Sequence, residues 1–179
     1  HVGTSAEYRH RDISQSVTYN PQTTVCTYRP VNVHGNYHVE VKMDFTRLLD
    51  RQNRWTWQSN LTARLDHSVD HVLFEDQTES CENAVNTLTL HENAYLQYER
   101  GPLSLRATGD ADWRHSEGRM RDFSTLNAID WQYGLSGRYT LPRLKTTFSA
   151  DMKMYSRRGY GERAMNSDEL VWNASVSYP

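Results

Sequence analysis

The residues from Arg54 to Asp66 alternate between apolar and polar side chains. Every even-numbered position in this segment is polar or charged, whereas the odd-numbered positions carry the apolar side chains of Trp55, Trp57, Leu61, Ala63 and Leu65. Successive residues of a β-strand point to opposite faces, so a shift of one residue in register would turn every side chain to the wrong side. The segment is therefore predicted to be a strand with one apolar face and one polar face.

The same alternation recurs in five further segments, at residues 36–46, 103–114, 129–141, 144–155 and 170–178. No stretch of the chain approaches the roughly 20 apolar residues that a membrane-spanning helix requires. A mean hydropathy of −0.82 is still compatible with a β-barrel, in which only alternate residues meet lipid. The chain also has 11 Tyr, 5 Trp and 4 Phe, residue types that form girdles at membrane interfaces. These patterns predict an all-β fold, an antiparallel up-and-down transmembrane β-barrel segment.

Three further strands are expected from weaker patterns. Residues 84–98 alternate well, except that Glu92 shares the parity of the apolar positions. Either a bulge that shifts the register or burial of Glu92 against a neighbouring domain would resolve this conflict. Residues 2–9 and 15–28 are predicted to be two more strands, the second interrupted at Pro21, which gives about nine strands in all.

The predicted connections alternate in length along the chain. Short turns are expected at residues 48–52, 100–101 and around Pro142, and long loops at residues 67–83, 116–124 and 157–167. Outer-membrane barrels combine short periplasmic turns with longer extracellular loops. The alternation therefore predicts that the short turns face the periplasm.

The length and charge of the chain limit its organisation and its partners. The 179 residues leave room for one domain, predicted to be a barrel segment over residues 1–179 without a plug domain. Because bacterial barrels usually close with an even number of strands, about nine strands indicate part of a larger barrel with more chain on both sides. A net charge of −2 provides no basic surface for nucleic acid, which is not expected as a partner. Any export signal is expected to be removed or to lie outside this segment.

Three runs of sequence carry a family resemblance: YRPVNVHGNY at residues 28–37, NTLTLHEN at 86–93 and, most specifically, YSRRGYGERAMNSDELVWNA at 155–174. They resemble the outer-membrane β-barrel family of TonB-dependent receptor-like proteins common in Bacteroidetes. The resemblance implies a plug domain, and usually a carboxypeptidase-regulatory-like domain, ahead of a barrel of about 22 strands. It also implies location in the bacterial outer membrane, contact with outer-membrane lipid and lipopolysaccharide, and a TonB system that acts through the plug.

The expected function is therefore part of the barrel of a TonB-dependent transporter or receptor that imports a nutrient or chelate. One alternative is a passive structural, adhesive or accessory outer-membrane barrel without transport. Another is a soluble extended β-sheet protein, in which Trp55, Trp57, Phe148 and Trp172 would pack against a second sheet. A plug domain upstream of His1 would favour the transporter, and a signal peptide directly upstream would favour the passive barrel.

The last predicted outer loop holds the candidate ligand-binding residues. Arg157, Arg158, Tyr160 and Arg163 surround a Gly-Tyr-Gly run and could contact an anionic ligand or a lipopolysaccharide phosphate, because arginine presents a fork of hydrogen-bond donors. The simpler interpretation is a turn at the loop tip that needs glycine.

The other polar residues give weaker signals. Charged side chains predicted to face the lumen could pair across strands or guide a polar solute; they are Lys42, Asp44, Arg64, Arg106, Asp110, Asp112, Asp130, Arg138, Asp151 and Lys153. Asp110 and Asp112 share a strand face without a nucleophile nearby, so no catalytic residue, no cofactor and no enzymatic activity are expected.

Histidines and cysteines leave two questions open. His67 and His71, with Asp66 and Asp70 nearby, would suit a borderline metal, but a solvated loop is the simpler interpretation and no metal site is assigned. The two cysteines, Cys26 and Cys81, could form a disulfide in an oxidising compartment or remain free thiols.

Overall fold

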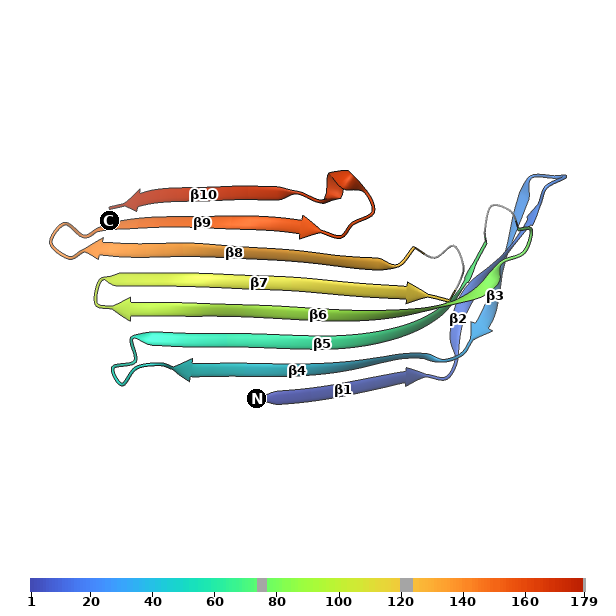
Figure 1. The fold of residues 1–179 in the computed structure, drawn as a ribbon, viewed down its shortest axis with the longest axis horizontal. Helices are drawn as coiled ribbons and strands as arrows, with labels where there is room; N and C mark the ends of the chain where they lie inside the picture. Colours follow the sequence, from blue (N-terminus) through green and yellow to red (C-terminus); the bar gives the residue numbers. More distant parts are fainter. Residues whose placement is uncertain (74–76, 120–123, 179) are drawn as a thin grey trace.

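The computed structural model describes residues 1–73, 77–119 and 124–178 and consists almost entirely of antiparallel strands (Figure 1). The ten strands within these ranges are β1 (Val2–Arg9), β2 (Asp12–Asn20), β3 (Val25–Val33), β4 (Asn36–Leu48), β5 (Trp55–Val72), β6 (Cys81–Arg100), β7 (Leu103–Gly118), β8 (Leu126–Leu141), β9 (Thr146–Arg158) and β10 (Asp168–Ser177). A single turn of 3-10 helix, η1, spans Arg163–Met165. Over the same ranges, no helix is long and apolar enough to cross a membrane. The all-β prediction is confirmed.

Eight of these strands form one antiparallel sheet, in the order β1-β4-β5-β6-β7-β8-β9-β10. The strands β1 and β10 are its edges and lie at opposite sides of the sheet in Figure 1, so the described sheet is not closed into a barrel. β2 and β3 form a second, two-stranded sheet, a hairpin at one end of the large sheet (Figure 1). An isolated bridge between Thr18 and Glu79 joins β2 to the residues just before β6. The up-and-down order is therefore observed from β4 to β10, in an open sheet.

The N-terminal region contains one strand more than expected. Residues 15–28, predicted as one interrupted strand, belong to the two strands β2 and β3, and the expected total of about nine becomes ten. A turn at residues 21–24 joins them, and Thr24 has a φ of 56° there. Pro21 is the physical reason, because proline has no N–H to donate to a ladder and favours turns over strand interiors.

Each ladder of the large sheet keeps a constant register, and this aligns the apolar faces of its strands. Met43 lies directly opposite Leu61, and Leu103 and Phe148 lie on either side of Tyr139. Cross-strand partners project to the same side of a sheet. The alternation predicted for separate strands thus produces one apolar face that continues across all eight strands, with one polar face behind it.

Glu92 interrupts this apolar face, and no bulge turns its side chain to the polar face. Leu61 and Ala111 lie opposite Glu92 on the neighbouring strands, and both ladders continue without interruption on either side of it. The proposed bulge is therefore wrong, because no register shift turns Glu92 to the polar face. The Ser59 hydroxyl instead donates a hydrogen bond to Oε1 of Glu92, at 2.5 Å.

From β4 to β10, the short and the longer connections lie at opposite ends of the sheet. The turns at residues 49–54, 101–102 and 142–145 lie at the left end of Figure 1, whereas the β5–β6, β7–β8 and β9–β10 connections and the β2–β3 hairpin lie at the other end. The predicted loop at residues 67–83 is shorter than expected, because β5 continues to Val72 and β6 begins at Cys81. Of the loop predicted at residues 116–124, residues 120–123 lie outside the described ranges.

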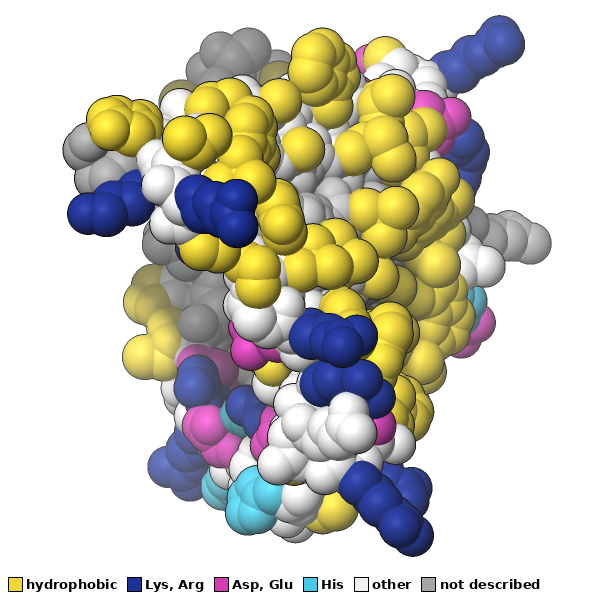
Figure 2. Space-filling model, turned by 90° about the vertical axis from the view of Figure 1, so that its left-hand side faces the viewer, with side chains coloured by type: hydrophobic (Ala, Val, Ile, Leu, Met, Phe, Trp, Pro, Cys, Tyr) yellow, Lys and Arg dark blue, Asp and Glu magenta, His cyan; other side chains and the backbone are white. Residues whose placement is uncertain are grey.

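The large apolar side chains are not gathered into a core. The buried apolar residues in the described ranges are Val33, Val69, Ala84 and Ala128, and the first three form a small cluster beside the hairpin. Trp57 is 42% exposed and Trp172 is 71% exposed. Trp55, Trp57, Phe148 and Trp172 do not pack under a second sheet, because the only second sheet among the described residues is the β2–β3 hairpin. Figure 2 shows hydrophobic side chains gathered over one side of the molecule, with charged side chains more numerous toward the opposite side.

Candidate functional site

The polar face of the large sheet is the candidate site. The ladder registers place all ten side chains that were predicted to face a lumen on this one face. The charges are mixed, and some pair within a strand: Lys42 Nζ lies 2.7 Å from Glu40, and Arg64 lies 2.7 Å from Asp66. Both of these ion pairs join residues two apart on one strand, whereas the sequence led us to expect pairs between neighbouring strands.

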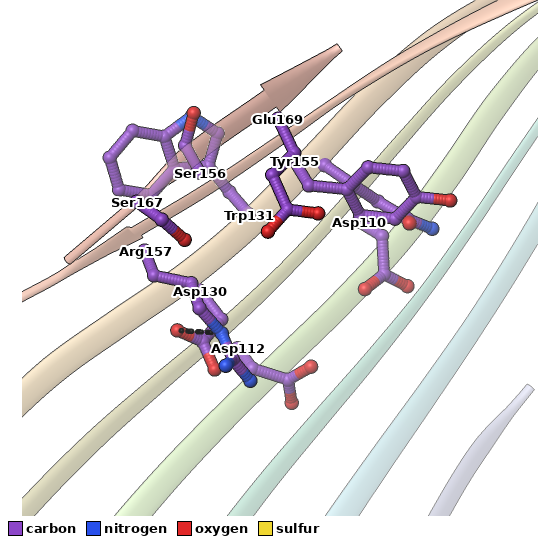
Figure 3. Close-up of a pocket in the computed structure, with 10 residues that line it drawn as sticks. Asp110, Asp112, Asp130, Trp131, Tyr155, Ser156, Arg157, Ser167 and Glu169 are labelled. Atoms are coloured by element: carbon purple, nitrogen blue, oxygen red, sulfur yellow. Dashed lines mark ion pairs between the residues drawn. The ribbon is translucent and has the colours of Figure 1, made fainter. Parts of the chain in front are cut away.

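A hollow of about 260 Å³ lies over β7, β8, β9 and the start of β10 (Figure 3). Its lining includes four carboxylates, from Asp110, Asp112, Asp130 and Glu169. Asp112 and Asp130 are direct cross-strand partners, an arrangement in which like charges repel. Arg157 Nε, 3.5 Å from Asp130 Oδ1, offsets part of this negative charge (Figure 3). The hollow is acidic and open to solvent.

His91 borders the acidic residues from the next strand. Its Nδ1 is 2.9 Å from Asp112 Oδ1, and its Nε2 is 4.0 Å from Asp110 Oδ2. Asn93 Nδ2 donates to the other side of this group, at 2.9 Å from Asp110 Oδ2. Ligand atoms of His91, Asp110 and Asp112 lie within 4.8 Å of one another, so the three side chains could hold a cation. Sequence reasoning missed His91, because only the β6–β7 register places it opposite Asp112.

The residues Asp66 to His71 do not form the metal-ligand set that their spacing allowed. They belong to β5 and not to a loop, so His67 and His71 project to one face while Asp66 and Asp70 project to the other. His67 stacks on Tyr37 with ring centroids 5.0 Å apart, and its Nδ1 lies 2.6 Å from Asn86 Oδ1. The strand geometry therefore separates the imidazoles from the carboxylates.

Only two of the four candidate ligand-binding residues come together. Tyr160 Oη donates to Asp130 Oδ2 at 2.7 Å, and the Arg157 guanidinium lies 5.9 Å from the Tyr160 ring centroid. This hydrogen bond, together with burial and the negative charge of Asp130, raises the pKa of Tyr160. Tyr160 thus reaches from the β9–β10 connection onto the polar face, where Arg157 and Asp130 already interact.

The other two candidates lie elsewhere. Arg158 follows Arg157 in β9 and therefore projects to the apolar face, where it pairs with Asp168 at 2.6 Å and lies 5.7 Å from the Trp131 ring centroid. Arg163 begins η1 and is exposed to solvent. The four residues do not form a single anion-binding cluster.

A second group on the polar face lies closer to the short turns. Tyr95 Oη donates to Gln58 Oε1 at 2.8 Å, and the Arg106 guanidinium covers the Tyr95 ring at 3.8 Å from its centroid. Beside them is a hollow of about 280 Å³ whose lining also includes Asp151 and Lys153. Gly134 also lines this hollow. The lining side chains present hydrogen-bond donors, hydrogen-bond acceptors and charges of both signs to a polar solute.

The cysteines are free thiols in the structure. Cys26 is exposed on β3, and Cys81 Sγ lies 3.3 Å from Gln77 Oε1 at the start of β6. Of the two alternatives that the sequence left open, the structure has the unbridged one.

Comparison of the chain with family models, curated proteins and solved structures gave no match.

Proposed function

We propose that this chain forms part of the wall of an outer-membrane β-barrel of the TonB-dependent transporter type, with its polar face toward the lumen and its apolar face toward lipid. The observation that carries the proposal is the single apolar face that continues across eight strands. A soluble protein would have to cover such a face, because exposed apolar patches larger than a few hundred Å² are rare on soluble monomers.

The dimensions and composition of the apolar face support a membrane location. Tyr37 and Phe45 bound the apolar run of β4, and this span matches the roughly 9–11 residues of a tilted transmembrane strand. All five tryptophans lie on this face, at Trp55, Trp57, Trp113, Trp131 and Trp172. Tryptophan and tyrosine are enriched where a barrel meets the membrane interfaces.

The polar face supports a role in passage of a solute. The two hollows described above are lined by charged and hydrogen-bonding side chains, and the one near β10 is bordered by Tyr160 from a long connection. In this proposal the long connections and the hairpin face the cell exterior, where they meet the solute and lipopolysaccharide. The plug domain and the TonB system are partners expected through a longer polypeptide.

Single cysteines along β7 test the orientation of the wall. We replace Cys26 and Cys81 with serine and introduce cysteine at Leu105 or Ala107 on the apolar face, or at Ser104 or Thr108 on the polar face. In intact outer membranes, a charged maleimide should label Ser104→Cys and Thr108→Cys, and a lipid-soluble maleimide should label the other two. Equal labelling of both sets by the charged reagent would contradict a lipid-facing wall.

A further inference from the structure

Glu92 places a carboxylate in the middle of the apolar face. Its direct cross-strand neighbours are Leu61 and Ala111, and Leu90 and Ala94 flank it along β6 on the same face. Unbroken ladders hold it there, and its side chain is half-buried. In a membrane wall, exposure of this carboxylate to lipid would cost free energy. We therefore expect a polar group to contact it.

The described residues provide Glu92 with a hydrogen bond but with no opposite charge. Ser59 donates one hydrogen bond to Oε1 of Glu92, and no ion pair within the described ranges includes Glu92. Asp168 on the same face has a cationic partner, since Arg158 lies 2.6 Å from it near the strand ends. Within the described ranges, no cationic side chain pairs with the carboxyl group of Glu92.

The surface around Glu92 allows another polypeptide to approach closely. Ala94, Gly109 and Ala111 lie on one side of the carboxylate and have minimal side chains, whereas Leu61 and Leu90 lie on the other side. A Cβ added at Gly109 would meet no atom within 4 Å, so the space above the backbone is open there. In membranes, small residues at an interface let two backbones pack closely and form hydrogen bonds.

We propose that the surface formed by Glu92, Ala94, Gly109 and Ala111 docks a membrane-embedded protein partner that brings a lysine or arginine side chain to Glu92. The inference rests on the proposed membrane location of the apolar face. Charge complementarity identifies the partner's chemistry, because a cation would form a charge-assisted hydrogen bond with the carboxylate. The small neighbours let the partner exclude lipid from that pair.

Photo-crosslinking in native outer membranes tests this docking surface. A photo-reactive amino acid replaces Ala111, beside Glu92, or Leu135, on the same face of β8 and 59% exposed. We expect Ala111 to give an adduct with a different polypeptide whose crosslinked peptide contains lysine or arginine. Leu135 should give adducts with lipid.

Matched variants identify the carboxylate and the small residues as the cause. Glu92→Gln keeps the shape but removes the charge, and it should lower the yield of the protein adduct about tenfold. Ala94→Leu should do the same by filling the surface, whereas Ala150→Leu, the same change on β9, should leave the yield unchanged.

Three results would overturn the docking surface: lipid adducts alone at Ala111, an adduct with a second copy of this chain, or an unchanged yield in Glu92→Gln. Absence of lipid adducts at Leu135 would overturn the membrane location instead. The two failures are therefore distinguishable.

Discussion

At the scale of single residues, Asp50 organises the turn between β4 and β5. Its Oδ1 accepts the backbone N–H groups of Arg54 and Trp55, at 2.6 and 3.0 Å, and its Oδ2 accepts Nε of Arg54 at 2.8 Å. The hydrogen bond from the Arg54 side chain is the largest cause of a lowered pKa of Asp50. A backbone conformation with a φ of 54° at Asn53 completes the reversal.

Replacing Asp50 should destabilise the folded protein in a pH-dependent way. Because the folded pKa lies below its ordinary value of 3.8, the carboxylate stabilises the fold above that value and loses this effect as pH falls through the folded pKa. Asp50→Ala should therefore lower the unfolding temperature in detergent at neutral pH by a few degrees, and the deficit should shrink below about pH 4.

Asp50→Asn is the matched control for that experiment. It retains an acceptor for the two backbone N–H groups but cannot form the ion pair with Arg54, so it should lose less stability than Asp50→Ala. Heat-induced mobility shifts on gels, measured between pH 3 and 7, would follow both variants. A deficit that is constant across this range would contradict the role of the carboxylate charge.

The sequence did not predict which side chains of the site contact each other across strands. Alternation predicted the face on which Asp112 and Asp130 lie, because that depends only on parity along a strand. The neighbour of each residue depends on register between strands, which brings His91 to Asp112 and Tyr160 to Asp130 across 21 and 30 residues. The parity of residues along one strand does not give the register between two strands, so it does not identify these partners.

At the scale of elements, β8 depends on a glycine where it passes β9. A Cβ at Gly134 would lie 2.9 Å from the backbone oxygen of Met152 and 3.1 Å from Cγ of Lys153. Contact with a backbone atom cannot be relieved by a change of rotamer. Gly134 therefore permits the close approach of the two strands.

Alanine substitutions at Gly134 and at Gly109 distinguish the need for close strand approach from the general effect of glycine on strand stability. Gly134→Ala should destabilise the protein by about 1–3 kcal/mol through overpacking. Gly109→Ala, in β7, meets no atom within 4 Å and should be neutral or stabilising by about 0.5–1 kcal/mol, because glycine is unfavourable in strand interiors. Denaturant unfolding in detergent measures the free energy of unfolding of both variants. Equal changes in the two would contradict the role of Gly134 in the close approach of β8 and β9.

The strands themselves were largely predictable, and their errors have physical causes. The strongly alternating segments all appear as strands, from β4 to β10. The mixed polarity of residues 67–83 predicts a loop, but β5 and β6 pair as far as Val72 and Cys81. Ladder hydrogen bonds can continue where side-chain alternation weakens.

At the scale of the whole molecule, the two edge strands of the large sheet each lack a partner on one side among the residues that the structure describes. β1 pairs only with β4, and β10 pairs only with β9, so each leaves a row of backbone donors and acceptors without strand partners. The up-and-down order from β4 to β10 was predictable from the sequence, but the pairing of β1 with β4 was not, because an up-and-down order pairs each strand with the next one along the chain. Closure was not predictable either, because it depends on what adjoins the two edges.

The mass of the native protein tests the transporter proposal at this scale. The protein is extracted from outer membranes, its band is identified by peptides from this chain, and its intact mass is measured. A plugged barrel of about 22 strands should have several times the 20.9 kDa of these 179 residues. A native product near 20.9 kDa would leave no room for a plug and would remove the case for TonB-driven uptake.

The β2–β3 hairpin leaves the wall and returns to the point where it left. Arg9, the last residue of β1, and Asn36, the first of β4, are direct cross-strand partners. The ladder between these strands would therefore be the same if a tight turn replaced residues 10–35. A graft of a different exterior structure between Arg9 and Asn36 would thus keep the β1–β4 pairing, but it would lose the packing of Val33 against Val69 and Ala84 and the hydrogen bond from Ser14 to Asp70.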